Sequence, residues 1–397
     1  MTKAIPSKQQ PSGSGYAQQI LKEAFTQWGA RLGLLWIVLL VVMAVFAPFI
    51  ANSHPLLLSV NGKIESPLLR YLGPADITLL VLFFAAIPLV ILNLRWRTRL
   101  AWLFLLTVVS GGLSAMFVSA PEISIYEQYR EQQQQGQYDW MIRAPIPYSP
   151  KDYLRDSGDT GLEAPFESGQ RLHLFGTEEN GADVFSRMLH ASRIALGIGF
   201  VATGIAMIIG VIIGGLMGYF SGVVDMIGMR LVEIFEAIPT LFLLLTFVAF
   251  FGRSLYIMMV IIGITSWSGY ARYIRAEFLK LRQQDFVQSA IACGLPLPSI
   301  LFRHMLPNGI APVLVAASFG VASAILAESV LSFLGLGLID DPSWGQMLNQ
   351  AVKSSTFNWW MAAFPGGAIF FTVFAYNLIG ESLRDAIDPY LKKSSRT

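Results

Sequence analysis

Uncharged apolar runs long enough to cross a membrane recur along this chain and leave little choice of fold. The first runs from Leu32 to Ser53, and the longest from Ile194 to Val224. The hydrocarbon core of a bilayer is about 30 Å thick, and a helix of about 20 apolar residues crosses it. Only 14% of the 397 residues are charged, whereas soluble domains carry about 25%. The sequence therefore predicts an all-α, polytopic membrane protein.

About eight transmembrane helices are predicted from these runs. Only RWRTR separates the second run from the third, and it contains Arg95, Arg97 and Arg99. Short loops rich in arginine and lysine stay on the cytoplasmic side, so this turn is predicted to be cytoplasmic, as are both chain ends. The predicted spans are 32–53, 77–94, 100–121, 194–224, 231–251, 254–271, 307–333 and 361–380.

The runs divide the chain into five parts. Leu21, Phe25, Trp28 and Leu32 recur at helical spacing before the first span, which is typical of an amphipathic helix on the membrane surface. The predicted parts are a cytoplasmic tail and interfacial helix (1–31), the first span with an inserted two-span hairpin (32–121), an external lobe rich in acidic residues (122–190), a helical core with a cytoplasmic segment at 272–307 (191–391), and a cytoplasmic tail (392–397).

A patterned polar segment from Arg282 to Asn308 separates the sixth run from the seventh. Its first half carries a one-sided apolar stripe at helical spacing. Gly294 is predicted to end this helix, and Pro296 and Pro298 forbid its immediate continuation. A short helix closed by glycine at the membrane face has the shape of a knob that fits a groove on a partner. The stripe consists of Phe286, Val287, Ala290 and Ile291.

The same segment resembles the cytoplasmic coupling loop of ABC-importer permeases. That loop reads Glu-Ala-Ala, three residues, Gly, and further on Leu-Pro. Gln288 replaces the Glu and Ser289 the first Ala, while the remaining positions match. The resemblance implies that this loop docks a separate ATPase subunit, through Gln288, Ala290, Gly294, His304, Leu306 and Pro307.

Further segments resemble the dipeptide and oligopeptide permease family. The stretch from His173 to Phe200 follows that family's pattern of Gly-Thr-Asp, two residues, Gly-Arg-Asp, two residues, Ser-Arg, with Glu178 and Ala182 as departures. The matches keep the family's order and imply a type I ABC-importer permease core. Residues 51–69 resemble, more loosely, the microcin C-type peptide permeases. The other matching segments are Glu233–Leu241, Glu328–Gly337, Pro342–Gly345 and Glu381–Pro389.

These resemblances imply a permease subunit that forms half of a path for peptides or peptide-like solutes and works by alternating access. The implied partners are nucleotide-binding ATPase subunits, a second permease subunit, an external solute-binding protein and the lipid of an inner (plasma) membrane, with no nucleic acid. No G-x-x-x-x-G-K-[ST] loop occurs in the sequence, so ATP is expected to be used by the partner. The chain itself is expected to bind no cofactor and to be no enzyme.

Three acidic residues are candidates for the pathway or its gate. Glu328 lies deep in a span, where a carboxylate is costly enough to suggest a function, although a structural pairing would also explain it. Glu233 and Glu236 are predicted to begin an outward helix, whose amino-terminal dipole favours negative charge. The four histidines are not clustered with carboxylates, so no metal site is predicted, and Cys293 is interpreted as a small packing residue.

Other functions remain open at this point. An ion- or proton-coupled carrier would need several charges within the membrane and broken helices, and only Glu328 is placed for such a role. The family also admits importers of other solutes, such as nickel chelates. A membrane sensor or scaffold with a ligand-binding lobe would leave the patterned polar segment without a purpose.

Overall fold

The structure is a computed structural model that describes residues 22–92, 96–119, 121, 126–154, 162–167, 172–338, 341–356 and 358–387. Predictions on Leu21, Arg95, Asp388 and Pro389, on most of the 1–31 tail and on the 392–397 tail fall outside these residues. The chain divides into two compact units, whose boundaries fall inside four helices. The first unit comprises Met1–Ile37, Gly197–Leu331 and Ile369–Thr397, and the second Val38–Leu196 and Ser332–Ala368.

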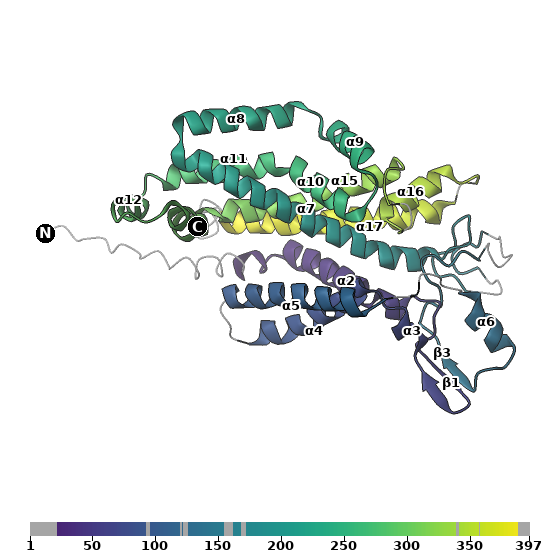
Figure 1. Cartoon of the computed structure of the whole chain (residues 1–397). Coiled ribbons are helices and arrows are strands. Elements are labelled where there is room, and N and C mark those ends of the chain that lie inside the picture. The colour runs from purple at the N-terminus through teal and green to yellow at the C-terminus, as the bar shows by residue number, and fades with distance from the viewer. Residues whose placement is uncertain are drawn as a thin grey trace. The chain divides into compact units, whose positions relative to one another are not determined.

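Helices dominate both units (Figure 1). They are α2 (Trp28–Ile50), α3 (Pro67–Arg70), α4 (Pro74–Ile91), α5 (Trp96–Phe117), α6 (Glu127–Gln134), α7 (Val184–Phe220), α8 (Gly222–Ala237), α9 (Thr240–Phe251), α10 (Leu255–Thr265), α11 (Trp267–Leu281), α12 (Asp285–Ala292), α13 (Leu297–Ser299), the π-helix η2 (Ile300–Met305), α14 (Leu306–Gly309), α15 (Ala311–Phe333), α16 (Trp344–Lys353) and α17 (Trp359–Ile387). The strands are β1 (Leu57–Val60), β2 (Lys63–Glu65) and β3 (Trp140–Ile142).

Each of the eight predicted spans coincides with a helix or a pair of successive helices, which confirms the helical membrane fold. Five described helices, α2, α4, α7, α15 and α17, are long and apolar enough to cross a membrane. The successive helices α8 and α9 make a sixth if they are counted as one broken span. Two shorter apolar helices, Ala101–Phe117 within α5 and Leu255–Thr265, fall on the remaining two predicted spans.

The prediction of one continuous helix over 231–251 is wrong. The chain bends by 83° between α8 and α9, as Figure 1 also shows. Ile238 is extended, with φ −87° and ψ 122°, because the ring of Pro239 excludes the residue before it from helical geometry. An apolar run therefore contains a corner that its hydropathy does not reveal.

Close packing of α7 against α11 organises the first unit. A Cβ at Gly214 would lie 2.3 Å from the carbonyl oxygen of Ala271, and one at Gly218 would lie 2.7 Å from that of Arg275. No larger residue fits at these distances, so the glycines allow the two backbones to meet. A small-residue face of this kind is how membrane helices approach each other closely.

The second unit contains a lobe, which was predicted to be external and to comprise only residues 122–190. Its sheet has the order β2-β1-β3, and both pairings are antiparallel. Strands β1 and β2 precede the α4–α5 hairpin in the chain, whereas β3 follows it. The hairpin is thus inserted into the lobe. The predicted all-α fold does not include this small sheet.

A buried polar cluster also joins the two halves of the lobe across the hairpin. Asp152 accepts hydrogen bonds from Arg130 and from the hydroxyl of Ser53. The exposed fractions of Arg130 and Asp152 are 5% and 3%, and a buried charge pair of this kind is tolerated because additional hydrogen bonds satisfy it. The lobe is therefore one structure made from two stretches of sequence.

Arg193 of α7 anchors the hairpin to the rest of the second unit. Its guanidinium pairs with Asp76 in the first turn of α4 and donates to the backbone oxygens of Ala44 and Val45 in α2. None of the residues of α4, all of which are described, is buried. Phe46 of α2 also packs edge-on against Phe83 and Phe84 in the middle of α4.

Candidate functional site

The predicted coupling helix is present as α12, and it ends as the sequence predicts. Gly294 has φ +69°, a left-handed conformation that glycine adopts without strain. Its N–H donates to the oxygen of Ile291 at 2.9 Å, and the N–H of Leu295 donates to the oxygen of Ala290 at 3.2 Å. These two bonds form a Schellman motif, which closes the helix.

The predicted coupling helix α12 is packed against core helices of the first unit. Val287 is fully buried and Ala290 is 6% exposed, and both belong to one apolar cluster with Phe278 of α11 and Met305 of η2. Protein interiors are packed too densely to absorb a displacement locally. A push on α12 is therefore transmitted to α11 and to the segment that leads into α15.

The remaining predicted coupling residues lie around this core. The amide of Gln288 donates to the backbone oxygen of Arg282 at 2.8 Å and joins α12 to the end of α11. His304 is half-buried in η2, Leu306 packs against the cluster, and Pro307 is exposed in α14. The predicted short helix over 299–305 is mostly a π-helix, a form that occurs often at functional sites.

The free side of the knob mixes apolar side chains with the exposed polar residues Asp285, Gln288 and Ser289. Phe286, Ile291 and Leu295 are 41%, 38% and 37% exposed. Cys293 is also exposed, so its interpretation as a packing residue is wrong: its side chain points away from the apolar cluster. The segment consequently offers a compact protrusion with three exposed apolar side chains and a packed attachment.

The acidic pair of α8 does not begin a helix. Glu233 and Glu236 lie near its carboxyl end, because α8 starts at Gly222 and stops at Ala237. The prediction that a helix dipole stabilises them is therefore wrong. Each is held by an arginine instead: Glu233 pairs with Arg230 of the same helix, and Glu236 with Arg272 of α11.

Glu328 is buried in α15, with 1% of its surface exposed. The hydroxyl of Ser329 lies 3.5 Å from its carboxylate. The carboxylate thus has structural contacts within the first unit, and its role in a pathway stays a prediction.

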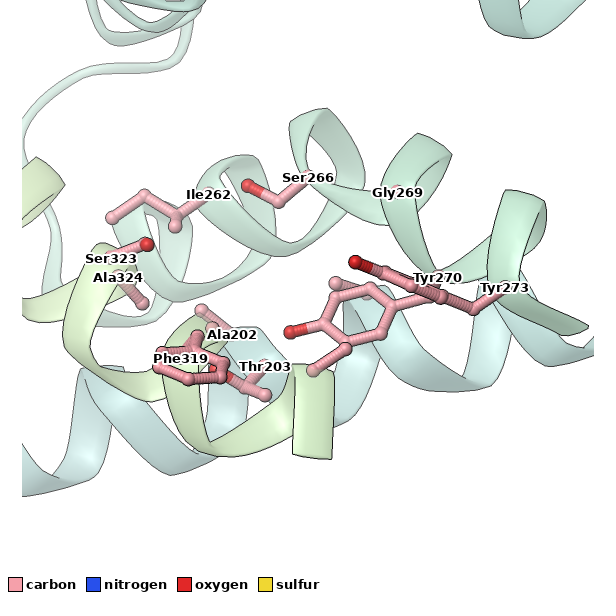
Figure 2. A pocket seen from close by; sticks show the side chains of 13 residues that line it. Ala202, Thr203, Ile262, Ser266, Gly269, Tyr270, Tyr273, Phe319, Ser323 and Ala324 are labelled. Atoms are coloured by element: carbon pink, nitrogen blue, oxygen red, sulfur yellow. The ribbon is translucent and has the colours of Figure 1, made fainter. Parts of the chain in front are cut away.

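A cavity of about 300 Å³ opens between α7, α10, α11 and α15 in the first unit (Figure 2). Its 13 lining residues include five with hydroxyl groups and none with a charge. Glu328 is not among them. The hydroxyl-bearing residues are Thr203, Ser266, Tyr270, Tyr273 and Ser323.

Tyr270 joins two walls of the cavity. A Cβ on Gly320 of α15 would lie 1.7 Å from the Tyr270 hydroxyl and 3.4 Å from Cγ2 of Thr203. The tyrosine of α11 therefore fits over the bare backbone of Gly320, beside a side chain of α7. Sequence reasoning missed these residues because three separate helices supply them. The polar residues Ser266, Tyr270 and Tyr273, at the start of α11 and directly before it, are their only sequence signal.

In the second unit, the residues of the family-like stretch from His173 build the start of α7. Asp183 accepts the N–H of Ser186 at 2.7 Å, which caps the helix, and its other oxygen lies 2.9 Å from Nδ1 of His173. Arg187 lies 3.4 Å from Glu178 and donates to Gln350 of α16 at 3.1 Å. These motif residues thus join the start of α7 to α16.

The exposed carboxylate of Glu179 stabilises the turn that precedes α17. Glu179 accepts hydrogen bonds from the backbone and hydroxyl of Ser355 and from the hydroxyl of Ser354, and these bonds lower the pKa of its carboxyl. Among the residues that the structure describes, no group of three or more His, Cys, Asp or Glu side chains is placed to hold a metal ion.

Membrane-length helices, a protruding glycine-closed helix and an uncharged cavity are features of a membrane transport subunit, and comparisons with known proteins agree. The family described as "Binding-protein-dependent transport system inner membrane component" matches residues 210–393. The N-terminal TM domain of oligopeptide transport permease C matches residues 15–74. The chain belongs to this family of transport permeases.

Named relatives support the assignment. The oligopeptide transport system permease protein OppC of Haemophilus influenzae is 38% identical over 62% of this chain and 77% of its own length. The dipeptide transport system permease protein DppC of Alkalihalophilus pseudofirmus is 37% identical over 63% and 81%. OppC of Escherichia coli K12 is 40% identical over 63% and 82%.

A solved structure is also similar. A chain of the inward-facing MetNI methionine ABC transporter has a TM-score of 0.42 and 17% identity. The similarity covers 51% of this chain and 96% of that chain.

Proposed function

We propose that the chain is the permease subunit of an ATP-binding-cassette importer for peptides or peptide-like solutes. The observation that carries the proposal is the coupling segment, in which a glycine-closed helix with exposed apolar side chains is packed against the core helices. The names of the relatives, oligopeptide and dipeptide transport permeases, supply the solute class.

The partners follow from the parts that the chain lacks or exposes. Its sequence contains no phosphate-binding loop, so ATP is hydrolysed by a separate nucleotide-binding subunit that docks on the knob, and this chain is not itself an enzyme. A second permease subunit completes the pathway, and an external binding protein delivers the solute. The chain lies in the inner membrane with both ends in the cytoplasm.

The cavity is our candidate for this chain's half of the pathway. Its volume of about 300 Å³ is at the lower end of the range for small-molecule sites. Its uncharged, hydroxyl-rich lining suits the neutral amide groups that all peptides share, because hydroxyls both donate and accept hydrogen bonds. The helices α11 and α15, which flank the coupling segment in the chain, form two of its walls. A movement of the knob therefore reshapes the cavity, which is the requirement of alternating access.

Reconstitution tests the proposal. The chain is expressed with the permease, ATPase and binding-protein subunits of its transport system, and uptake of labelled dipeptides into vesicles is followed. Uptake should need ATP and should cease when the ATPase subunit cannot hydrolyse it. Uptake driven by a proton gradient without ATP would instead identify a coupled carrier. Mass spectrometry of the solute retained by the binding protein would reveal a nickel chelate if that were the cargo.

A further inference from the structure

One face of the lobe's sheet carries four apolar side chains around Ser59, which is buried and donates a hydrogen bond to the carboxylate of Asp139. Leu57 lies opposite Ile142 across the β1–β3 pair. Ser59 lies opposite Ile64 of β2 on one side and Trp140 of β3 on the other. Residues paired directly in antiparallel strands present their side chains on the same face. We call the set formed by Leu57, Ile64, Trp140 and Ile142 the outer sheet face.

The outer sheet face is open in this chain. The exposed fraction is 39% for Leu57, 66% for Ile64, 41% for Trp140 and 48% for Ile142. On the opposite face, Leu58 is only 3% exposed and belongs to the interior of the lobe. A contiguous exposed apolar patch marks a surface that contacts another protein or a membrane.

Chain connections hold this face close to the membrane. Ile146 donates its N–H to the oxygen of Ile50, the last residue of α2, at 2.9 Å. Ile142 precedes Ile146 by four residues, and four extended residues reach at most about 14 Å. On its other side, the sheet leads through α3 into α4, which starts at Pro74. Figure 1 shows β1 and β3 near α3, beyond the lobe-side ends of α4 and α5.

We propose that the outer sheet face is a membrane contact that rests in the headgroup region of the leaflet on the lobe's side. Tryptophan is enriched at this level of a bilayer, and Trp140 lies on this face in the edge strand β3. Apolar faces of interfacial elements sink roughly 5–10 Å into the headgroup and acyl boundary. The polar neighbours Lys63 and Glu65 lie on the other face of β2, so one side of the strand meets lipid and the other meets water.

Two adjacent positions of β2 provide a matched test. In a Cys293→Ala background, Ile64→Cys and Lys63→Cys are each labelled with an environment-sensitive fluorophore. Both positions are exposed on an edge strand, so both variants should fold. The full chain is reconstituted in vesicles of phosphatidylethanolamine and phosphatidylglycerol, with or without lipid that carries a nitroxide on its headgroup. The nitroxide should remove at least half of the fluorescence at position 64 and much less at position 63.

A second variant tests the face itself. Trp140→Asp combined with Ile142→Asp should release the sheet and restore most of the fluorescence at position 64. Equal quenching at both positions, or no quenching at either, would overturn the proposal. So would a label at position 64 that lipid does not quench but that addition of the external binding protein shields, because the face would then be a protein-docking surface.

Discussion

Replacing Gly294 by valine tests whether the shape of the knob couples ATP hydrolysis to transport. No atom lies within 4 Å of the position that a Cβ would occupy at Gly294, so the substitution causes no clash. The cost comes from the backbone alone: at φ +69° a left-handed conformation costs an L-residue about 1–2 kcal/mol. Asparagine tolerates this conformation better than valine does.

This strain translates into a measurable loss. Since 1.4 kcal/mol corresponds to a tenfold change in an equilibrium constant, Gly294→Val should weaken docking of the ATPase subunit by about five- to thirtyfold. The measurements are binding of the ATPase subunit to vesicles, and ATP hydrolysis stimulated by substrate-loaded binding protein. Insertion in the membrane should be normal, because the strained turn lies outside the spans.

Two further variants isolate the cause. Cys293→Val places the same side chain on the adjacent exposed residue, where φ is −73°, and should dock and transport normally. Gly294→Asn should retain most of the activity. If Gly294→Val binds the ATPase subunit and supports uptake as well as Cys293→Val does, the left-handed turn is not what shapes the coupling surface.

Three other outcomes are expected. Gly320→Leu should abolish uptake but not ATPase docking, because a Cβ there would already lie 1.7 Å from a tyrosine hydroxyl of the cavity. Gly204→Leu is the control for uptake and should leave it unchanged, because Gly204 lies in the membrane-length helix α7 and no atom is within 4 Å of the position of its Cβ. Asp139 accepts two hydrogen bonds across the β1–β2 turn, which lower the pKa of its carboxyl below the ordinary value of 3.8. Its stabilising effect is therefore present at neutral pH and lost as the pH falls through that lowered value, and limited proteolysis of the lobe should show a smaller acid response in Asp139→Asn. In a cysteine-free background, a cysteine at Thr98 should resist an impermeant external thiol reagent in intact cells, whereas one at Gln134 should react; reaction at Thr98 would contradict the eight-span topology.

The features that sequence predicted well are those set by local chemistry. A backbone in lipid must satisfy its own hydrogen bonds, so apolar length translates directly into helices such as α7 and α15. The end of α12 could also be predicted, because Gly294 is suited to the positive φ that a closing turn requires. Gly214 and Gly218 of α7 recur at a four-residue spacing that favours a close helix contact, but this spacing does not specify α11 as the partner.

Two structural features that were not predicted do have a signal in the sequence. The break between α8 and α9 occurs at Ile238, directly before Pro239, and proline disfavours helical geometry in the preceding residue. The β1–β2 hairpin turns at Asn61 and Gly62, whose φ values of 51° and 77° fit a type I′ turn, for which Asn-Gly is a strong signal.

Other features depend on contacts between distant parts of the chain. β3 pairs with β1 across the whole inserted hairpin, and no local pattern near Trp140 specifies that partner. The cavity needs Thr203, Tyr270 and Gly320, one from each of three helices. Such groupings arise only when the helices pack, so they cannot be predicted from local sequence patterns.

The insertion of α4 and α5 between paired strands has a consequence for how the protein is made. β1 leaves the ribosome well before β3, and the two can pair only if both hairpin helices have crossed the membrane in the meantime. If either helix fails to insert, the strands end on opposite sides of the bilayer and the lobe cannot close. Folding of the lobe therefore depends on correct membrane insertion of both helices. A protease that degrades unfolded lobes would remove misinserted chains during biogenesis.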